Sequence, residues 1–200
     1  MENSKLQQLI KSKAISLGLM LSFFLILHIG TIGKENLQND AKFKKDNGIE
    51  GNYTIDKNGL CNVDGNVDLS KRGLKEIPIP FGTVSGSFWC ENNQLITLVG
   101  APTKVGGSFD CRNNQLKTLK FAPKTVSGTF LCDNNKLTSL EGAPTKVGGS
   151  FWCNANQLTS LKGAPKTVGG DFWCSNNSIQ FTVANVRKVS KVKGKIYVKE

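Results

Sequence analysis

This chain of 200 residues has very little histidine and no closely spaced pair of cysteines. His28 is the one histidine, and no two of the six cysteines lie two to four residues apart. Zinc sites are built from such short Cys and His pairs, so the sequence predicts no metal site. Hydrolysis or acyl transfer needs a nucleophile beside a base, but His28 lies in an apolar segment and the carboxylates are scattered. We therefore expect no catalytic residue, no cofactor and no enzymatic activity.

Acidic residues are few relative to basic ones. The chain has 15 Asp and Glu against 26 Lys and Arg, which is a formal net charge of +11. A basic balance permits binding to nucleic acid or to an anionic membrane without specifying either. Since many basic proteins bind neither, we do not expect nucleic acid to be the partner.

Charge is absent from residues 14–33, and Lys5, Lys11 and Lys13 precede this run. A positive start followed by the apolar stretch 15–27 is typical of a secretory signal. The whole run of about 20 residues is also long enough to cross a bilayer as a helix. Two alternatives stay open: a single-pass membrane anchor, or a signal peptide cleaved near Gly33 to release the chain. Residues 34–51 are polar and without periodicity, as in a linker.

The cysteines that are present indicate a repeat, because five of the six recur at one fixed interval. Five segments align without gaps at a period of 21 residues, and three more columns keep the same interval. The four columns are Phe88, Phe109, Phe130, Phe151 and Phe172; Cys90, Cys111, Cys132, Cys153 and Cys174; Asn93, Asn114, Asn135, Asn156 and Asn177; and Val84, Val105, Val126, Val147 and Val168. A diverged unit around Val67 and Leu69 precedes them, as expected of a terminal repeat.

The pattern F-x-C-x-x-N-x-L-x-x-L resembles the leucine-rich repeat L-x-L-x-x-N-x-L-x-x-L. The whole unit is more similar to repeat proteins of bacteria and large tailed phages, with their C-x-x-N-x-L-T-S-L-E-G-A-P-x-x-V-G-G units. The resemblance covers roughly residues 52 to 200. It implies a parallel sheet with one short strand per repeat and an interaction role, and it names no partner.

The residue types fit such a coil. In F-x-C the Phe and Cys side chains face the core, and the residue between them faces outward. The cysteines are expected to act as small buried hydrophobes, and each Asn amide is expected to pair with backbone groups of neighbouring turns. Gly pairs such as Gly106 and Gly107 allow tight turns or close packing. Pro102 and its equivalents preclude regular helix on the convex side.

Both ends of the repeat array need caps. At the N-terminal end the sequence predicts a hairpin over residues 53–63, with a turn at Lys57, Asn58 and Gly59, and then an Asp64-Gly65 turn before Val67. At the other end, residues 192–198 resemble V-G-G-x-F-x-C displaced by three residues, and the insertion at 182–190 predicts a short helix.

The expected fold class is a mainly β, leucine-rich-repeat-like solenoid with a hairpin cap, a cap of a short helix plus a strand, and a separate N-terminal hydrophobic helix. The expected organisation is a signal peptide or transmembrane anchor over 1–33, a polar linker over 34–51, an N-terminal cap over 52–66, repeats over 67–181 and a C-terminal cap over 182–200.

The outward positions of the strands are the candidate binding site. All three tryptophans of the chain fall in this one column, and Trp and Arg are enriched in interface hot spots. The candidate residues are Trp89, Asp110, Arg112, Leu131, Trp152 and Trp173. We expect a protein or peptide to bind there, on the concave sheet. The alternative is that the tryptophans only stack along the sheet and shield it.

Two further ligands remain open from the sequence. Aromatic faces also stack on sugars, so a carbohydrate is one alternative. The other is an anionic surface, lipid or nucleic acid, that binds the basic C-terminal cap. The basic residues of that cap are Arg187, Lys188, Lys191, Lys193, Lys195 and Lys199.

Overall fold

The computed structural model describes residues 34–199, with side chains placed from residue 40 onward. The expected signal peptide or membrane anchor, residues 1–33, lies outside this part of the chain. Within the described residues no helix is long and apolar enough to cross a bilayer.

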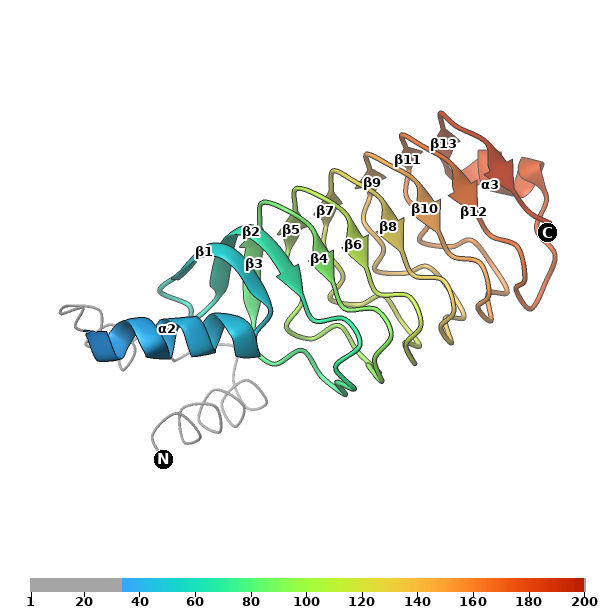
Figure 1. Ribbon diagram of the computed structural model, residues 1–200. Helices are drawn as coiled ribbons and strands as arrows, with labels where there is room; N and C mark the ends of the chain where they lie inside the picture. Colours follow the sequence, from blue (N-terminus) through green and yellow to red (C-terminus); the bar gives the residue numbers. More distant parts are fainter. Residues whose placement is uncertain (1–33, 200) are drawn as a thin grey trace.

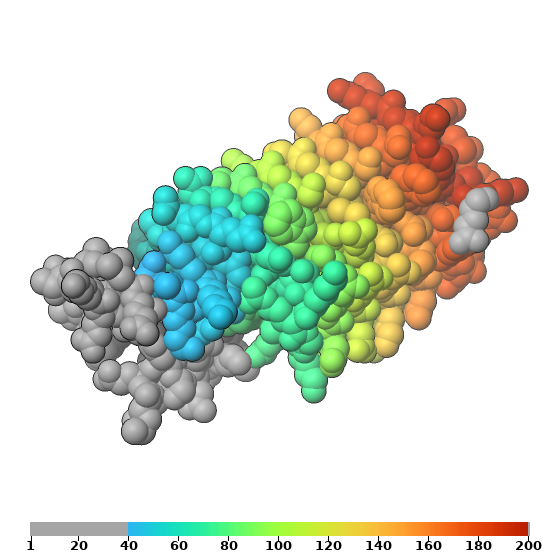
Figure 2. Space-filling model, viewed as in Figure 1, coloured from blue at the N-terminus to red at the C-terminus, as the bar shows by residue number. Residues whose placement is uncertain are grey.

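The chain winds into a parallel β-solenoid whose coils follow one another along a single axis (Figures 1 and 2). Each coil contributes one short strand to each of two rows within a 14-stranded sheet. The front row consists of β4 (Phe88–Trp89), β6 (Phe109–Asp110), β8 (Phe130–Leu131), β10 (Phe151–Trp152), β12 (Phe172–Trp173) and β14 (Ile196–Tyr197). The back row consists of β3 (Phe81–Val84), β5 (Lys104–Val105), β7 (Thr125–Val126), β9 (Lys146–Val147), β11 (Thr167–Val168) and β13 (Lys191–Val192).

The front row is the strand that the F-x-C pattern predicts, and the back row is an addition to the expected single strand per repeat. In β5, Lys104 is exposed and Val105 is buried, so the two residues alternate as they do in any strand. The Val column was visible in the sequence. A strand of two residues, however, is too short for a period of two to show.

The core is a set of columns that run through all the coils. Phe88, Phe109 and Phe130 are fully buried, and their rings stack with centroids 5.5 and 5.4 Å apart. The cysteine and leucine columns are buried in the same way. Because strands in register repeat at about 4.8 Å, like residues meet like residues, and the 21-residue period becomes a packed interior.

The asparagine column satisfies backbone groups where each strand ends. Asn114 is 8% exposed; its Nδ2 donates to the carbonyls of Cys90 and Cys111, and its Oδ1 accepts from the backbone N–H of Leu95. Buried backbone groups need partners, and one amide here supplies both a donor and an acceptor. The expected structural role of this column is therefore confirmed.

The corner between the back row and the next front strand is closed by two complementary columns. The hydroxyl of Thr129 accepts from the backbone N–H of Ser150 at 3.3 Å, and a Cβ added to Gly149 would lie 2.7 Å from that same hydroxyl oxygen. The same column is glycine in every coil, from Gly86 to Gly194. The Gly pairs therefore serve close packing between coils.

The N-terminal cap is the expected hairpin, formed by β1 (Ile49–Ile55) and β2 (Cys61–Asp68) in antiparallel register. The expected turn at Asp64 and Gly65 is wrong, because both lie inside β2. Gly65, with φ of 142°, is opposite Gly51, and β2 passes there from pairing with β3 to pairing with β4. The two glycines allow this change of row instead of a chain reversal.

The polar stretch 34–51 contains secondary structure that its composition does not predict. Helix α2 (Lys34–Asp46) occupies most of it, and Ile49 begins β1. The ring of Phe43 stacks on Tyr53 at 5.1 Å, and Arg72 donates to the carbonyls of Lys45 and Asp46. Among the described side chains of the helix, Phe43 is the aromatic one that packs on the hairpin, and a lone aromatic residue gives no apolar stripe in the sequence.

The C-terminal cap agrees with the displaced register. Helix α3 (Val183–Val189) is capped by Thr182 and buries Val186. After it the chain rejoins both rows, with Val168 paired to Val192 and Phe172 paired to Ile196. The insertion thus closes the end of the core, and the last coil resumes the repeat.

Candidate functional site

The outward positions of the front row form one continuous column, which we call the outer column. Parallel pairing places its members side by side in chain order. They are Asp68, Trp89, Asp110, Leu131, Trp152, Trp173 and Tyr197. The three tryptophans and Leu131 are half-buried, and Asp110 is only 4% exposed. The side chains of the column point outward, but they are partly covered by the side chains of neighbouring coils.

The C-terminal half of the outer column is an aromatic stack. The rings of Trp152 and Trp173 lie 5.0 Å apart, and those of Trp173 and Tyr197 lie 3.7 Å apart. Leu131 precedes Trp152 in the same column. Sequence reasoning missed Tyr197 as a site residue, although the displaced V-G-G-x-F-x-C match places it at the outward position.

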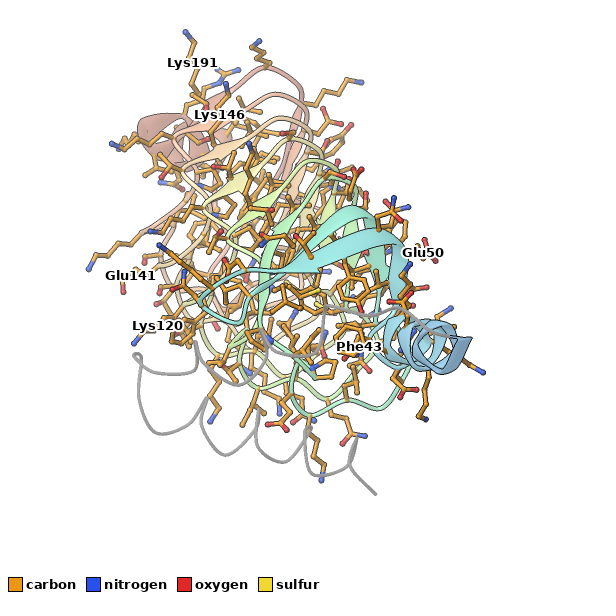
Figure 3. All side chains as sticks on the ribbon, turned by 90° about the vertical axis from the view of Figure 1, so that its left-hand side faces the viewer. Phe43, Glu50, Lys120, Glu141, Lys146 and Lys191 are labelled. Atoms are coloured by element: carbon orange, nitrogen blue, oxygen red, sulfur yellow. The ribbon has the colours of Figure 1, made fainter. Side chains whose placement is uncertain are left out.

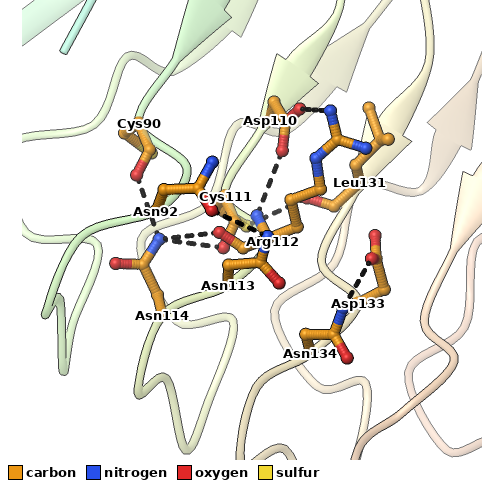
Figure 4. Close-up of polar contacts among 10 residues, drawn as sticks. All are labelled: Cys90, Asn92, Asp110, Cys111, Arg112, Asn113, Asn114, Leu131, Asp133 and Asn134. Carbon is orange, nitrogen blue, oxygen red and sulfur yellow. Dashed lines mark hydrogen bonds and ion pairs between the residues drawn. The ribbon is translucent and has the colours of Figure 1, made fainter. Parts of the chain in front are cut away.

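The N-terminal half of the column contains Asp68 and Asp110. Glu91, Arg112 and Asp133, each two residues after an outer-column position, flank it, and we call these five residues the acidic half (Figure 4 shows Asp110, Arg112 and Asp133). Arg112 Nη2 lies 3.1 Å from a carboxylate oxygen of Asp110, and the other oxygen of Asp110 accepts the Arg112 backbone N–H. Asp133, one coil further on, is 5% exposed and accepts from the Asn134 side chain at 3.4 Å. The structure therefore brings Asp110, Arg112 and Leu131 together and adds Asp133 and Glu91, which were not candidates.

Burial controls the electrostatics of this acidic half. It raises the pKa of Asp110 to about 6, against the lowering effect of Arg112, and Glu91 and Asp133 raise that pKa further. Burial also raises the pKa of Asp133. Oδ1 of Asp133 and Oε2 of Glu91 are buried and have no hydrogen-bond partner in the described part of the chain. Such acceptors favour a ligand that brings N–H donors.

The cysteine column is interior and is not a reactive site. All six cysteines are buried free thiols, and Cys111 Sγ donates to the carbonyl of Leu131 at 3.3 Å. Burial raises the pKa of the Cys111 thiol well above its usual value, so the nucleophilic thiolate is suppressed. This agrees with the expected role of Cys as a small buried hydrophobe.

A groove lies beside the hairpin, on the back row. Its volume is about 600 Å³, and sequence reasoning missed it. Ser85 Oγ and Asp64 Oδ1 are 2.8 Å apart, and Thr83 Oγ1 donates to Asn62 Oδ1 at 2.9 Å. Its polar side chains thus pair with one another. No signal marked it, because the groove is lined jointly by β1, β2 and the first back strands, which are far apart in the sequence.

Among residues 34–199 no group of three or more His, Cys, Asp or Glu side chains is arranged to hold a metal ion. His28 lies outside the described residues. Arg112 is the cation that forms an ion pair with Asp110 in the acidic half.

Fold and site together define a class: a repeat protein that is a parallel β-solenoid with a mixed acidic and aromatic column on one row of strands. Comparison with protein-family models, with curated proteins and with solved structures gave no match to this chain. The function must therefore be argued from the geometry.

Proposed function

We propose that the protein is a non-catalytic interaction module that binds a protein or peptide partner on its front row. The observation that carries the proposal is the aromatic stack of Trp152, Trp173 and Tyr197 on an outward strand face. Aromatic side chains of this kind supply large contact area at low entropy cost and dominate interface energies. By this proposal the chain belongs with the leucine-rich-repeat-like solenoids that its F-x-C-x-x-N-x-L pattern resembles.

The partner should match both halves of the outer column. Apolar side chains suit the stretch from Leu131 to Tyr197. A lysine or arginine side chain suits the acidic half, where Asp133 Oδ1 and Glu91 Oε2 have no hydrogen-bond partner. A strand-like segment lying across the coils would place the basic group and the apolar groups in that order. The apolar run 14–33 is the basis for proposing that the module is membrane-anchored or exported.

A carbohydrate is the second candidate, and Trp89 is the observation that favours it. Within the described residues no aromatic ring stacks on Trp89, which lies between Asp68 and Asp110. An indole with no ring stacked on it, between two carboxylate side chains, suits a sugar ring. The faces of Trp152 and Trp173 are already turned toward each other, so they leave edges for a ligand. This difference favours the protein partner over the sugar.

The test is selection of a binding peptide from a random library on the full chain, followed by affinity measurement with variants. Trp152→Ala with Tyr197→Ala should weaken binding of the selected peptide by at least about 30-fold, which corresponds to a loss of about 1 kcal/mol at each position. Lys104→Gln with Lys146→Gln, on the back row, is the matched control and should leave affinity unchanged. Equal loss in both variants would contradict the front-row site. Binding of soluble oligosaccharides that Trp89→Ala abolishes would favour the sugar instead.

A further inference from the structure

The back row carries a charged surface that the proposed partner site does not use. Its outward strand positions alternate in register between threonine and lysine, from Thr83 to Lys191. Where the strand position is threonine, in β7 and β11, the preceding residue is lysine. Every coil from β5 to β13 therefore presents a lysine. The lysines are Lys104, Lys124, Lys146, Lys166, Lys191 and Lys193.

These six lysines form what we call the lysine stripe. All six are exposed, and none makes an ion pair with another described side chain. No Asp or Glu occurs in the four residues around each back-row strand from β5 to β13. These segments are 103–106, 124–127, 145–148, 166–169 and 190–193. Figure 3 shows Lys146 and Lys191 projecting on the same side, away from Lys120 and Glu141 on another edge. These segments thus carry only positive charge along five coils, or about 19 Å at 4.8 Å per coil.

We propose that the lysine stripe lies against an anionic lipid bilayer. Long, exposed lysines spread along one face are attracted to acidic headgroups, and each contributes independently. The same positions carry no aromatic side chain for stacking on bases and no arginine for bidentate phosphate contacts. That composition disfavours a single-stranded nucleic acid as the occupant.

Three further features favour the bilayer. In the coils beyond the groove the positions beside the lysines are small, such as Gly148 and Gly169, so a flat surface can approach the stripe there. The exposed Lys195 of the C-terminal cap extends the same charge. The chain also has the uncharged apolar run 14–33, which would bring the solenoid to a membrane. The stripe and the outer column belong to different rows, so the front row stays open to its partner.

The test is co-sedimentation of the full chain with neutral phosphatidylcholine vesicles and with vesicles containing 30% phosphatidylserine. For each variant the ratio of the two partition coefficients removes the contribution of the apolar run, which is the same in both lipids. Lys104→Gln, Lys146→Gln and Lys191→Gln together should lower this ratio by about 100-fold, at roughly fivefold per lysine. The control triple Lys117→Gln, Lys120→Gln and Lys136→Gln removes the same charge from another face.

The control should lower the ratio by less than about threefold. An equal fall in both triples would overturn the proposal, because net charge alone would then explain the binding. A wild-type ratio near one would overturn it as well. So would tighter binding to a single-stranded oligonucleotide than to the anionic vesicles, if the stripe triple abolished it. The result is independent of peptide binding, which the stripe triple should leave intact.

Discussion

The interior columns and the outer column of the same coils follow opposite rules. Inside, Phe follows Phe and Cys follows Cys through five coils, and every ring or thiol packs on its own kind. Outside, on the same strands, the residue changes from Trp89 to Asp110 to Leu131 and back to Trp152. Identity inside is what stacking in register requires. The variation outside is therefore where a partner can be specified, since the fold does not demand it.

The largest difference between the two columns should appear on truncation to alanine. Phe130→Ala opens a void between the rings of Phe109 and Phe151, and should lower the free energy of unfolding by about 3–5 kcal/mol. Leu131→Ala, the next residue, removes a half-buried outward side chain and should cost about 1 kcal/mol. Denaturant unfolding of both variants measures the contrast. Equal losses would show that the interior column is no more specifically packed than the outer one.

The interior could be predicted from the sequence because its columns repeat. The period of 21 residues, the burial of Phe and Cys, and the pairing role of Asn114 follow from stacking like residues in register. The displaced C-terminal coil could be predicted for the same reason, because residues 192–198 keep the spacing of the V-G-G-x-F-x-C pattern. Features that depend on one coil alone had no such signal.

The outer column shows why the rest could not be predicted. Asp110 sits at a position that is half-buried in other coils, yet it is 4% exposed because Arg112 and the adjacent coils cover it. The stack of Tyr197 on Trp173 needs the last coil to rejoin the row. These contacts join unlike side chains, so the 21-residue repeat gives no sequence signal for them. The sequence was enough to single out the three tryptophans as candidates. It did not show that Trp152 and Trp173 stack on each other while Trp89 has no ring stacked on it among the described residues.

The buried carboxyl of Asp110 gives the outer column a pH dependence in the acidic range, whereas burial moves the titration of the interior thiols to alkaline pH. Its folded pKa of about 6 exceeds the value near 3.9 of an unfolded aspartate, so the folded state binds the proton more tightly. The free energy of unfolding should therefore fall as the pH rises from about 4 to about 6, by an amount of order 2–3 kcal/mol. Asp110→Asn should remove this change, because the amide keeps an acceptor for the Arg112 N–H and does not titrate.

The measurement is denaturant unfolding of wild type and Asp110→Asn at several pH values. Their difference isolates Asp110 from Asp133, whose raised pKa acts in the same direction. Parallel curves between pH 4 and pH 6 would contradict the burial argument. If wild type instead loses stability relative to Asp110→Asn as the pH falls from 6 to 4, the ion pair with Arg112 outweighs burial.

The smallest expected effect concerns a turn at which one coil has phenylalanine and the other coils have glycine. Phe121 has φ of 71° and is 52% exposed, whereas the equivalent positions in other coils are Gly100, Gly142 and Gly163, all with positive φ. A left-handed backbone costs a side-chain-bearing residue about 1–2 kcal/mol. Glycine loses somewhat more freedom on folding, so Phe121→Gly should raise the free energy of unfolding by only about 1 kcal/mol.

The reciprocal change sharpens this comparison. A Cβ at Gly142 would lie 2.6 Å from the carbonyl carbon and oxygen of Leu119, so Gly142→Ala should destabilise the protein by about 1–2 kcal/mol. If both substitutions lower stability, Phe121 must gain enough from its contact with Lys120, whose Nζ lies 5.2 Å from the ring centroid, to offset the strain. If Phe121→Gly stabilises the fold as expected, the exposed ring is retained at a cost in stability.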